Sequence, residues 1–343
     1  MVTYLRRLLC VVVLGGLVTS CSSPDNRDIQ KAFQAYQALF IDNGRIVDTG
    51  NQNVSHSEGQ GYGLLFAVAA DDKATFDRVW AWTKTVMQRE DKLFHWRYRP
   101  CVSKDKNCID DPNNASDGDL LIAWALLRAS EKWGDGHYRE ESADIMQAME
   151  SSLFFETEKY LVMLPGEYGF VEDASVQTNL SYWVFPAIDA MAKESKTPHR
   201  WRSLHESGTS LIYQAKFSKQ NLPPDWLRIS SGTLSLENTV SQEYGFNACR
   251  IPLHLVWAGI DDDAFFTDIK QWWDGDNTPA TMNLITEEQA EYSMTPGMQA
   301  VESAVRHILD NEPLVLPTID RNMDYYSASL TLLSMVAVMD TTH

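Results

Sequence analysis

Eleven segments of the chain carry apolar residues at three- and four-residue spacing, and this helical period is what most restricts the fold. Several segments are apolar on nearly every side, which indicates helices buried among other helices. The segments are residues 28–40, 61–72, 74–87, 119–133, 142–153, 181–195, 201–217, 247–259, 262–273, 297–309 and 325–339. About eleven or twelve such helices predict a single all-α domain over residues 28–340.

Three long connections separate these helices, at residues 95–116, 160–179 and 218–242. Long connections between packed helices are usually either functional or disordered. These three are rich in Trp, Tyr, Asp and Pro, so we expect them to be ordered. The stretch "LRISSGTLSL" (227–236) predicts a small β-hairpin on one face of the domain.

Residues 1–20 have the plan of a secretory signal: two arginines, a short apolar run and then small residues. The "VTS" before Cys21 resembles a bacterial lipobox, in which the cysteine is acylated. This resemblance implies export to the periplasm, a tether over residues 21–27 and a lipid anchor at Cys21. Ser22 after the cysteine favours the outer membrane. The alternative is an ordinary signal peptide that is cut nearby.

The chain is strongly acidic. Loss of the segment with Arg6 and Arg7 would take the formal net charge from −18 to −20. Such a charge argues against binding nucleic acid or an anionic polymer through bulk electrostatics. It is compatible with a neutral or cationic ligand, although an acidic surface that keeps the protein soluble is the simpler interpretation.

The cysteines indicate a disulfide rather than a metal site. Cys101 and Cys108 flank six residues of a polar loop, and in an oxidising compartment they predict a local disulfide. Their spacing does not suit zinc, and the histidines are scattered. Cys249 lies in an apolar stretch and is expected to be buried. We therefore expect neither a metal nor an organic cofactor.

The first acidic motif is "SEGQGYG", at the start of an apolar helix. Glu58 stands in the first turn, where Ser55 or Ser57 can cap the helix and the helix dipole favours a carboxylate for structural reasons alone. Three glycines follow at alternate positions, and glycine is costly inside a helix. Their density predicts close approach by another chain or by a ligand.

The second acidic motif is "ASDGD", which opens the helix at residues 119–133. Asp117 and Asp119 fall at its start, with Ser116 as the expected cap. Paired acids at a helix start are commonly structural, so on their own they leave a catalytic role open.

Residues 115–133 resemble glycoside hydrolase family 8 at every fixed position of the family's pattern. "SEGQGYG" is similar to the family's general-acid segment, and "DYYSASLTLL" (324–333) to the segment that brings tyrosines to its substrate cleft. Further segments resemble the cellulase that accompanies bacterial cellulose synthases; they are "LPGEYGFVED" (164–173), "TNLSYW" (178–183) and "LPPDW" (222–226). The resemblance follows the order of the chain over most of its length.

The resemblance implies an (α/α)6 barrel, in which inner and outer helices alternate, and a hydrolase that cleaves β-1,4-linked polysaccharide with inversion. The substrate would be a cellulose-like β-glucan or a related exopolysaccharide, and exopolysaccharide synthesis machinery becomes a possible partner. Glu58 matches the proton donor and Asp117 the acid that holds the sugar at the cleavage point.

Inversion requires two carboxyl groups about 6.5–9.5 Å apart, one acting as an acid and the other activating water. The acid must remain protonated, which burial or a neighbouring negative charge favours, and Asp117 could supply that charge to Glu58. Aromatic and basic side chains would bind the sugar, and the candidates are Tyr62, Trp96, Tyr182, Arg250 and Tyr326.

One position departs from the family's cellulase branch, which reads Tyr-Asp-Ala-x-Arg with the Asp as general base. This chain has Asn247 there, while Arg250 matches. An amide can orient water but cannot take its proton. In a branch that includes chitosanases, Asn occupies this position and a Glu of the preceding loop is the base. That likeness favours Glu243, or failing it Glu237, as the base, with Asn247 orienting the water.

Two other interpretations of Asn247 remain open. The chain could be a polysaccharide-binding lipoprotein that has lost hydrolysis, although it keeps Glu58 and Asp117. It could also cut a different polymer, such as chitosan or xylan.

Overall fold

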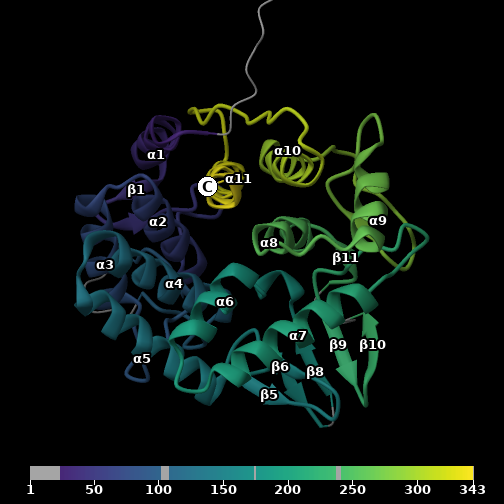
Figure 1. The fold of residues 1–343 in the computed structure, drawn as a ribbon, viewed down its shortest axis with the longest axis horizontal. Coiled ribbons are helices and arrows are strands. Elements are labelled where there is room, and N and C mark those ends of the chain that lie inside the picture. The colour runs from purple at the N-terminus through teal and green to yellow at the C-terminus, as the bar shows by residue number, and fades with distance from the viewer. Residues whose placement is uncertain (1–23, 102–107, 174, 237–240, 343) are drawn as a thin grey trace, which may run out of the picture.

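The computed structural model describes residues 24–342 except 102–107, 174 and 237–240. Its described part contains eleven α-helices, arranged as a ring within a ring (Figure 1). The inner helices are α2 (Ser57–Ala69), α4 (Ser116–Trp133), α6 (Phe185–Glu194), α8 (Ile251–Trp257) and α11 (Tyr325–Thr342). The outer helices are α1 (Asn26–Phe40), α3 (Lys73–Val86), α5 (Gly136–Ser152), α7 (Pro198–Gln214), α9 (Asp263–Trp273) and α10 (Pro296–Asp310). This is the all-α ring that the sequence predicted.

Outer and inner helices alternate along the chain until α9, which is followed by a second outer helix, α10 (Figure 1). Residues 274–295 occupy the step between them. Within that stretch β12 (Met282–Asn283) pairs antiparallel with β11 (Glu243–Tyr244). The described ring is therefore one inner helix short of a strict sixfold alternation.

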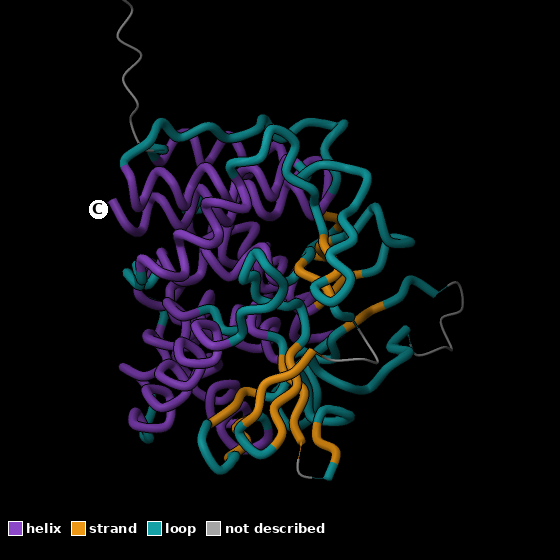
Figure 2. Tube along the Cα trace, turned by 90° about the vertical axis from the view of Figure 1, so that its right-hand side faces the viewer, coloured by secondary structure: helices purple, strands orange, loops and turns teal. Residues whose placement is uncertain are grey.

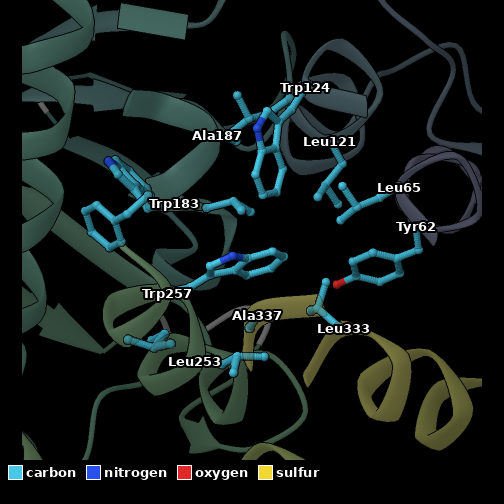
Figure 3. Close-up of a cluster of buried hydrophobic side chains, with 14 of the residues drawn as sticks. Tyr62, Leu65, Leu121, Trp124, Trp183, Ala187, Leu253, Trp257, Leu333 and Ala337 are labelled. Carbon is cyan, nitrogen blue, oxygen red and sulfur yellow. The ribbon is translucent and has the colours of Figure 1, made fainter. Parts of the chain in front are cut away.

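Burial explains the two kinds of helix. α2 and α11 are buried along almost their whole length because other helices surround them. The outer helix α1 buries only one stripe, at three- and four-residue spacing. Figure 3 shows the centre of the ring, where the inner helices meet; its labelled side chains include Leu65, Leu121, Trp124, Ala187, Leu253, Trp257 and Leu333.

The glycines of the acidic motifs let the inner helices touch through their main chains. A Cβ on Gly61 would lie 2.6 Å from Leu121 Cβ, and one on Gly118 would lie 2.7 Å from the main-chain nitrogen of Glu58. The predicted close approach is found, but its partner is another helix of the same chain and not a second chain or a ligand.

The predicted serine caps are wrong. His56 and Ala115 hold the N-cap positions of α2 and α4, and neither side chain caps its helix. Ser57 and Ser116 each lie one position inside the helix, and their buried hydroxyls have no hydrogen-bond partner among the described residues. The tight contact between α2 and α4 holds Ser57 against Gly118, away from the free N–H groups of its own helix.

Two predicted helices begin later than expected. The segments 181–195 and 247–259 each start with a 3-10 turn, η1 (Leu180–Tyr182) and η2 (Ala248–Arg250), before α6 and α8. Pro186 and Pro252 stand in the first turn of those α-helices. Proline has no N–H to donate and its ring restricts the preceding residue, so a regular helix does not extend back through it.

Strands and loops gather on one side of the ring (Figure 2). The predicted hairpin forms from β9 (Leu227–Ser230) and β10 (Thr233–Leu236), and its turn residues Ser231 and Gly232 both have positive φ. Two strands that the sequence did not predict, β7 (Val171–Glu172) and β8 (Ser175–Thr178), extend it to the order β10-β9-β8-β7. The short pairs are β1 (Ile41–Asp42) with β2 (Arg45–Ile46), β3 (Ser55–His56) with β4 (Arg97–Tyr98), and β5 (Phe154–Glu156) with β6 (Leu161–Met163).

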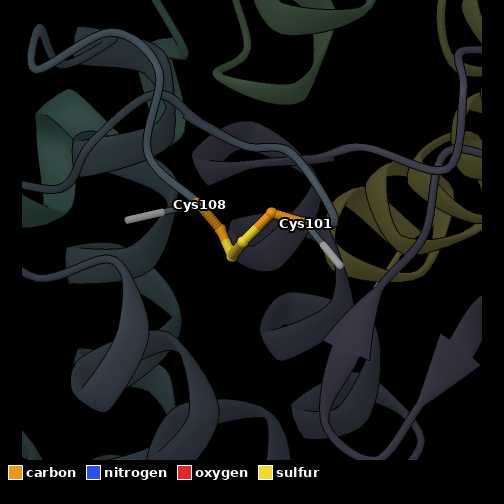
Figure 4. The surroundings of a disulfide bond; sticks show 2 residues. All are labelled: Cys101 and Cys108. Carbon is orange, nitrogen blue, oxygen red and sulfur yellow. A yellow bond between two sulfur atoms is a disulfide. The ribbon is translucent and has the colours of Figure 1, made fainter. Parts of the chain in front are cut away.

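Cys101 and Cys108 form the disulfide that their spacing predicted, with Cα atoms 5.5 Å apart (Figure 4). Cys249 is buried and takes no part in a disulfide. None of the helices in the described residues is long and apolar enough to cross a membrane. Cys21, the predicted signal and the first three residues of the predicted tether lie outside the described residues. The tether was predicted to extend to residue 27, but α1 already begins at Asn26, where the side chain of Asp25 caps the helix.

Gly61 offers a test of the helix contact. Alanine normally favours a helix over glycine by up to about 1 kcal/mol. At Gly61 the added methyl would overlap Leu121, so we expect Gly61→Ala to lower the free energy of unfolding by about 1–3 kcal/mol, measured by urea denaturation. Gly136→Ala is the matched control, since nothing lies within 4 Å of a Cβ there. Equal stability of the two variants would contradict the packing argument.

Candidate active site

Three inner helices begin at the end of the ring that carries the loops and strands (Figure 2). Their first turns bring Glu58 of α2, Asp117 of α4 and Tyr326 of α11 to one place, and η2 adds Arg250. A helix N-terminus carries a partial positive charge, which favours carboxylates there. The ring thus assembles from distant segments the residues that the sequence proposed as a site.

Arg250 lies at the centre of this group with only 3% of its surface exposed. Its guanidinium forms an ion pair with Glu58 and donates hydrogen bonds to Tyr62 Oη at 3.0 Å, Ser181 Oγ at 2.9 Å and Asn247 Oδ1 at 3.0 Å. The planar fork of arginine fixes the relative positions of its partners. One buried cation therefore ties together α2, η1 and η2.

Glu58 and Asp117 are joined by a hydrogen bond between their carboxyl groups. Burial would raise the pKa of Glu58, but the Arg250 cation and the bond from Asp117 outweigh it and hold that pKa below its usual range. Burial and the negative charge of Glu58 raise the pKa of Asp117 well above its usual range. Of the two carboxyl groups, Asp117 therefore holds a proton more tightly. The expectation that Asp117 would raise the pKa of Glu58 is reversed, because Arg250 pairs with Glu58.

Tyr62 is 1% exposed and supports the same pair. Its hydroxyl donates to Glu58 Oε1 at 3.3 Å and accepts from Arg250. Burial raises the pKa of this phenol well above its usual value, so it remains a neutral donor. Any part that Tyr62 takes in substrate binding acts through Glu58 and Arg250.

Trp96 lies in the loop before the disulfide. Its indole N–H donates to Asp111 at 2.8 Å, and its ring is nearly parallel to that of His56, with centroids 6.0 Å apart. The guanidinium of Arg97 lies 4.3 Å from its centroid. Trp96 is thereby held rigidly next to His56, the residue before α2.

Tyr182, at the end of η1, and Tyr326, in the first turn of α11, each pack against another aromatic ring. Tyr182 meets Trp226 edge to face, with centroids 6.2 Å apart. The hydroxyl of Tyr326 donates to the carbonyl of Phe246, and the two rings lie 5.8 Å apart. Phe246 is 38% exposed, so this pair offers an apolar surface beside Asn247.

Asp119, the second acid of "ASDGD", has a structural task. It is fully buried and accepts hydrogen bonds from the main chain of Phe94 at 2.8 Å and from the amide of Asn114 at 2.6 Å. Burial raises its pKa to about 7. Asp119 thus holds both ends of the loop that carries Trp96.

Glu243 lies in β11 and is exposed. Its carbonyl accepts a hydrogen bond from Asp225 N at 2.7 Å, while no hydrogen bond or ion pair of its carboxylate is found among the described residues. Glu237 lies outside the described residues. The assignment of either as the base stays a prediction, whereas Asn247 lies within the Arg250 group.

Asp225 of the "LPPDW" segment is a functional candidate that the sequence analysis did not single out. It is 7% exposed, and its Oδ1 accepts hydrogen bonds from the main-chain nitrogens of Gly245 at 3.0 Å, Asn247 at 3.2 Å and Ala248 at 2.8 Å. Burial raises its pKa to about 6. The available signal was a single acid directly after two prolines, in a segment noted only for its resemblance.

The arrangement is suited to proton transfer. Two hydrogen-bonded carboxyl groups lie beside a fixed cation, and the aromatic side chains of Tyr62 and Tyr182 lie near them. No group of three or more His, Cys, Asp or Glu side chains within the described ranges is placed to hold a metal ion. Glycoside hydrolysis needs a carboxyl group as proton donor beside the bound sugar, so the fold and this site together indicate a glycoside hydrolase of the (α/α) barrel type.

The family model for glycosyl hydrolases family 8 matches residues 8–340, and the chain belongs to that family. Among curated proteins it is 38% identical to a probable endoglucanase of Novacetimonas hansenii, with 92% of each chain covered. It is 37% identical to an endoglucanase of Cellulomonas uda, over 90% of this chain and 84% of that one.

Solved structures agree with this assignment. An endo-β-1,4-glucanase from Acetobacter xylinum superposes with a TM-score of 0.86 at 35% identity, covering 93% of this chain and all of that one. A family 8 endoglucanase from Klebsiella pneumoniae gives a TM-score of 0.83 at 39% identity, covering 90% and 99%. The expected (α/α)6 barrel fold is confirmed.

The ion pair between Arg250 and Glu58 yields a stability test. Their side chains are 4% and 22% exposed, and removing one partner of a buried pair typically costs about 3–5 kcal/mol. We expect a loss of this order in the free energy of unfolding of Arg250→Met at pH 7, measured in urea. Adding Glu58→Gln should recover at least about 1 kcal/mol, because a neutral amide needs no cation.

Arg139→Met is the control for this test. Arg139 pairs with Glu194 at the surface, with 43% and 32% of the side chains exposed. Such pairs are worth at most about 1 kcal/mol. If Arg250→Met cost no more than Arg139→Met, the central role of this cation in the site would be refuted.

Proposed function

We propose that the protein is an endo-β-1,4-glucanase that hydrolyses cellulose-like β-glucan with inversion at the anomeric carbon. The observation that carries the proposal is the hydrogen-bonded pair of Glu58 and Asp117, held by Arg250 at the start of the inner helices. The printed names of its family 8 relatives, at 37–38% identity, support the β-1,4-glucan as substrate.

In the proposed reaction Glu58 protonates the oxygen of the leaving sugar. The proton is at hand on Asp117 and reaches Glu58 along the hydrogen bond between the two carboxyl groups. Asp117 is then an anion beside the sugar at the cleavage point, where positive charge develops on the ring in the transition state. Arg250 keeps Glu58 in place while the proton moves.

On the opposite face of the sugar a water attacks the anomeric carbon. Asn247 lies in the same hydrogen-bonded group as Glu58 and is suited to orient that water. We keep Glu243 as the proposed acceptor of the water's proton, on the resemblance to the family branch with Asn at this position. Its exposed strand position would require it to approach the site when substrate is bound.

We further propose that the protein works outside the cytoplasm, anchored by a lipid on Cys21 after removal of residues 1–20, with the residues between Cys21 and α1 as a tether. Support comes from the "VTS" before Cys21 and from the disulfide of Cys101 and Cys108, which suits an oxidising compartment. The outer membrane as its site, and exopolysaccharide synthesis machinery as its partner, belong to the same proposal.

Replacing the proton donor tests the mechanism. Glu58→Gln should lower kcat on carboxymethyl-cellulose by at least about 10²-fold, because general acid catalysis typically contributes 10²- to 10⁴-fold. Reducing ends are counted, with Glu206→Gln as a matched control on an outer helix, away from the pair. A folded Glu58→Gln protein with full activity would refute the role of Glu58.

Product analysis tests the mode of attack. We expect solution viscosity to fall early relative to the release of reducing ends, as internal cuts require, and the first product to be the α-anomer by NMR. Mixed-link glucan, xylan and chitosan are screened in parallel. Saturable oligosaccharide binding without reducing ends on any polymer would instead favour a binding protein and refute the proposed hydrolase.

A further inference from the structure

The carboxylate of Asp225 lies directly behind Asn247. Besides holding the main chain of the turn at residues 245–248, it forms a hydrogen bond with the side chain of Asn247. Gly245 makes room for this contact, because a Cβ there would lie 2.9 Å from Asp225 Oδ2. The amide of Asn247 is thus bonded on both ends, to Asp225 on one side and to Arg250 on the other.

These two partners allow only one orientation of the amide. A guanidinium only donates hydrogen bonds and a carboxylate only accepts them. Asn247 must therefore turn its oxygen toward Arg250 and its NH2 group toward Asp225. A flipped amide would set donor against donor and acceptor against acceptor, and would leave both ends of a partly buried group unsatisfied.

We propose that Asp225 is a positioning residue for hydrolysis: it fixes the amide of Asn247 so that its oxygen, which Arg250 also contacts, orients the attacking water. Arg250 uses one lone pair of that oxygen, and the second can accept a hydrogen bond from water. The inference rests on the proposed hydrolytic function and adds to it a residue on the water side.

The charge of Asp225 is part of this role. Only the ionised carboxylate accepts from the Asn247 amide and from the three main-chain nitrogens together. The charged and titratable groups that face it are Arg250, Cys249 and Tyr244. Of these Arg250 is a permanent cation, and burial keeps the Cys249 thiol and the Tyr244 phenol neutral at physiological pH.

Asp225→Asn in the full chain provides the first test. The introduced amide keeps an oxygen for the main-chain nitrogens but turns an NH2 group toward that of Asn247. We expect kcat on carboxymethyl-cellulose to fall about 10- to 100-fold, since misplacement by 1 Å can cost 10²-fold, while KM changes less than about threefold. The dependence of kcat on pH below about 6, where Asp225 titrates, should weaken in the variant.

A second substitution separates positioning from simple loss of structure. In an Asn247→Asp background the carboxylate at position 247 accepts hydrogen bonds from both neighbouring side chains. The NH2 group that Asp225→Asn introduces can then donate to this carboxylate. We expect Asp225→Asn to cost less than about threefold in kcat there, against 10- to 100-fold in the wild-type background. A merely structural role predicts the same loss in both backgrounds, with a lowered Tm in each, and would overturn the proposal.

Asp268→Asn is the matched control. Asp268 lies on α9, bonds to Lys216 and Asn221, and has a side chain that is 19% exposed. It should retain wild-type kcat. If the wild-type protein is active and Asp225→Asn is equally active, the role of Asp225 is refuted, but the proposed hydrolase is not. A wild-type protein inactive on every polymer would refute the hydrolase itself, so the two failures are distinguishable.

Discussion

The buried guanidinium of Arg250 is the interaction on which the rest of the site depends. It binds Glu58, Tyr62, Ser181 and Asn247, and so connects three separate segments of the ring. A charge so well enclosed is stable only with its counter-charge and its hydrogen bonds in place. The same requirement that keeps this end of the barrel folded also keeps its acids in a fixed arrangement, so stability and the geometry for catalysis have one source here.

The position of the shared proton follows from that cation. Two neighbouring carboxyl groups cannot both ionise cheaply when buried, and the one closer to a positive charge ionises first. Arg250 selects Glu58 as the anion, which leaves the proton on Asp117. In the proposed reaction the donor Glu58 therefore receives its proton from Asp117. The two carboxyl groups are one hydrogen bond apart. We expect the proton to pass from Asp117 to Glu58 when the oxygen of the leaving sugar binds beside Glu58.

The sequence predicted much of this, but not all. Helical period placed all eleven described helices, because an apolar stripe directly reflects burial. The three alternating glycines predicted a close contact of α2, and the family pattern led to Glu58 and Asp117. Three features were beyond reach. The serine caps failed because α2 and α4 begin one residue earlier than a serine cap requires, at Ser57 and Ser116 themselves. The direction of the pKa shifts depended on Arg250, 192 residues away from Glu58. The role of Asp225 could not be predicted because its hydrogen-bond partners lie in the turn at residues 245–248, 20 or more residues further along the chain.

The glycine contact between α2 and α4 has a consequence for how such a site can change during evolution. Where Gly118 meets the backbone of Glu58, the spacing of the two acids is set by main-chain atoms, which substitutions cannot resize. On the water side Asn247 and Asp225 meet through side chains carried by a turn, where one replacement alters the chemistry without moving a helix. One side of the site is thus set by contact between main chains, and the other by side chains. A chain that keeps both acids yet carries an amide at position 247 is what such a division permits.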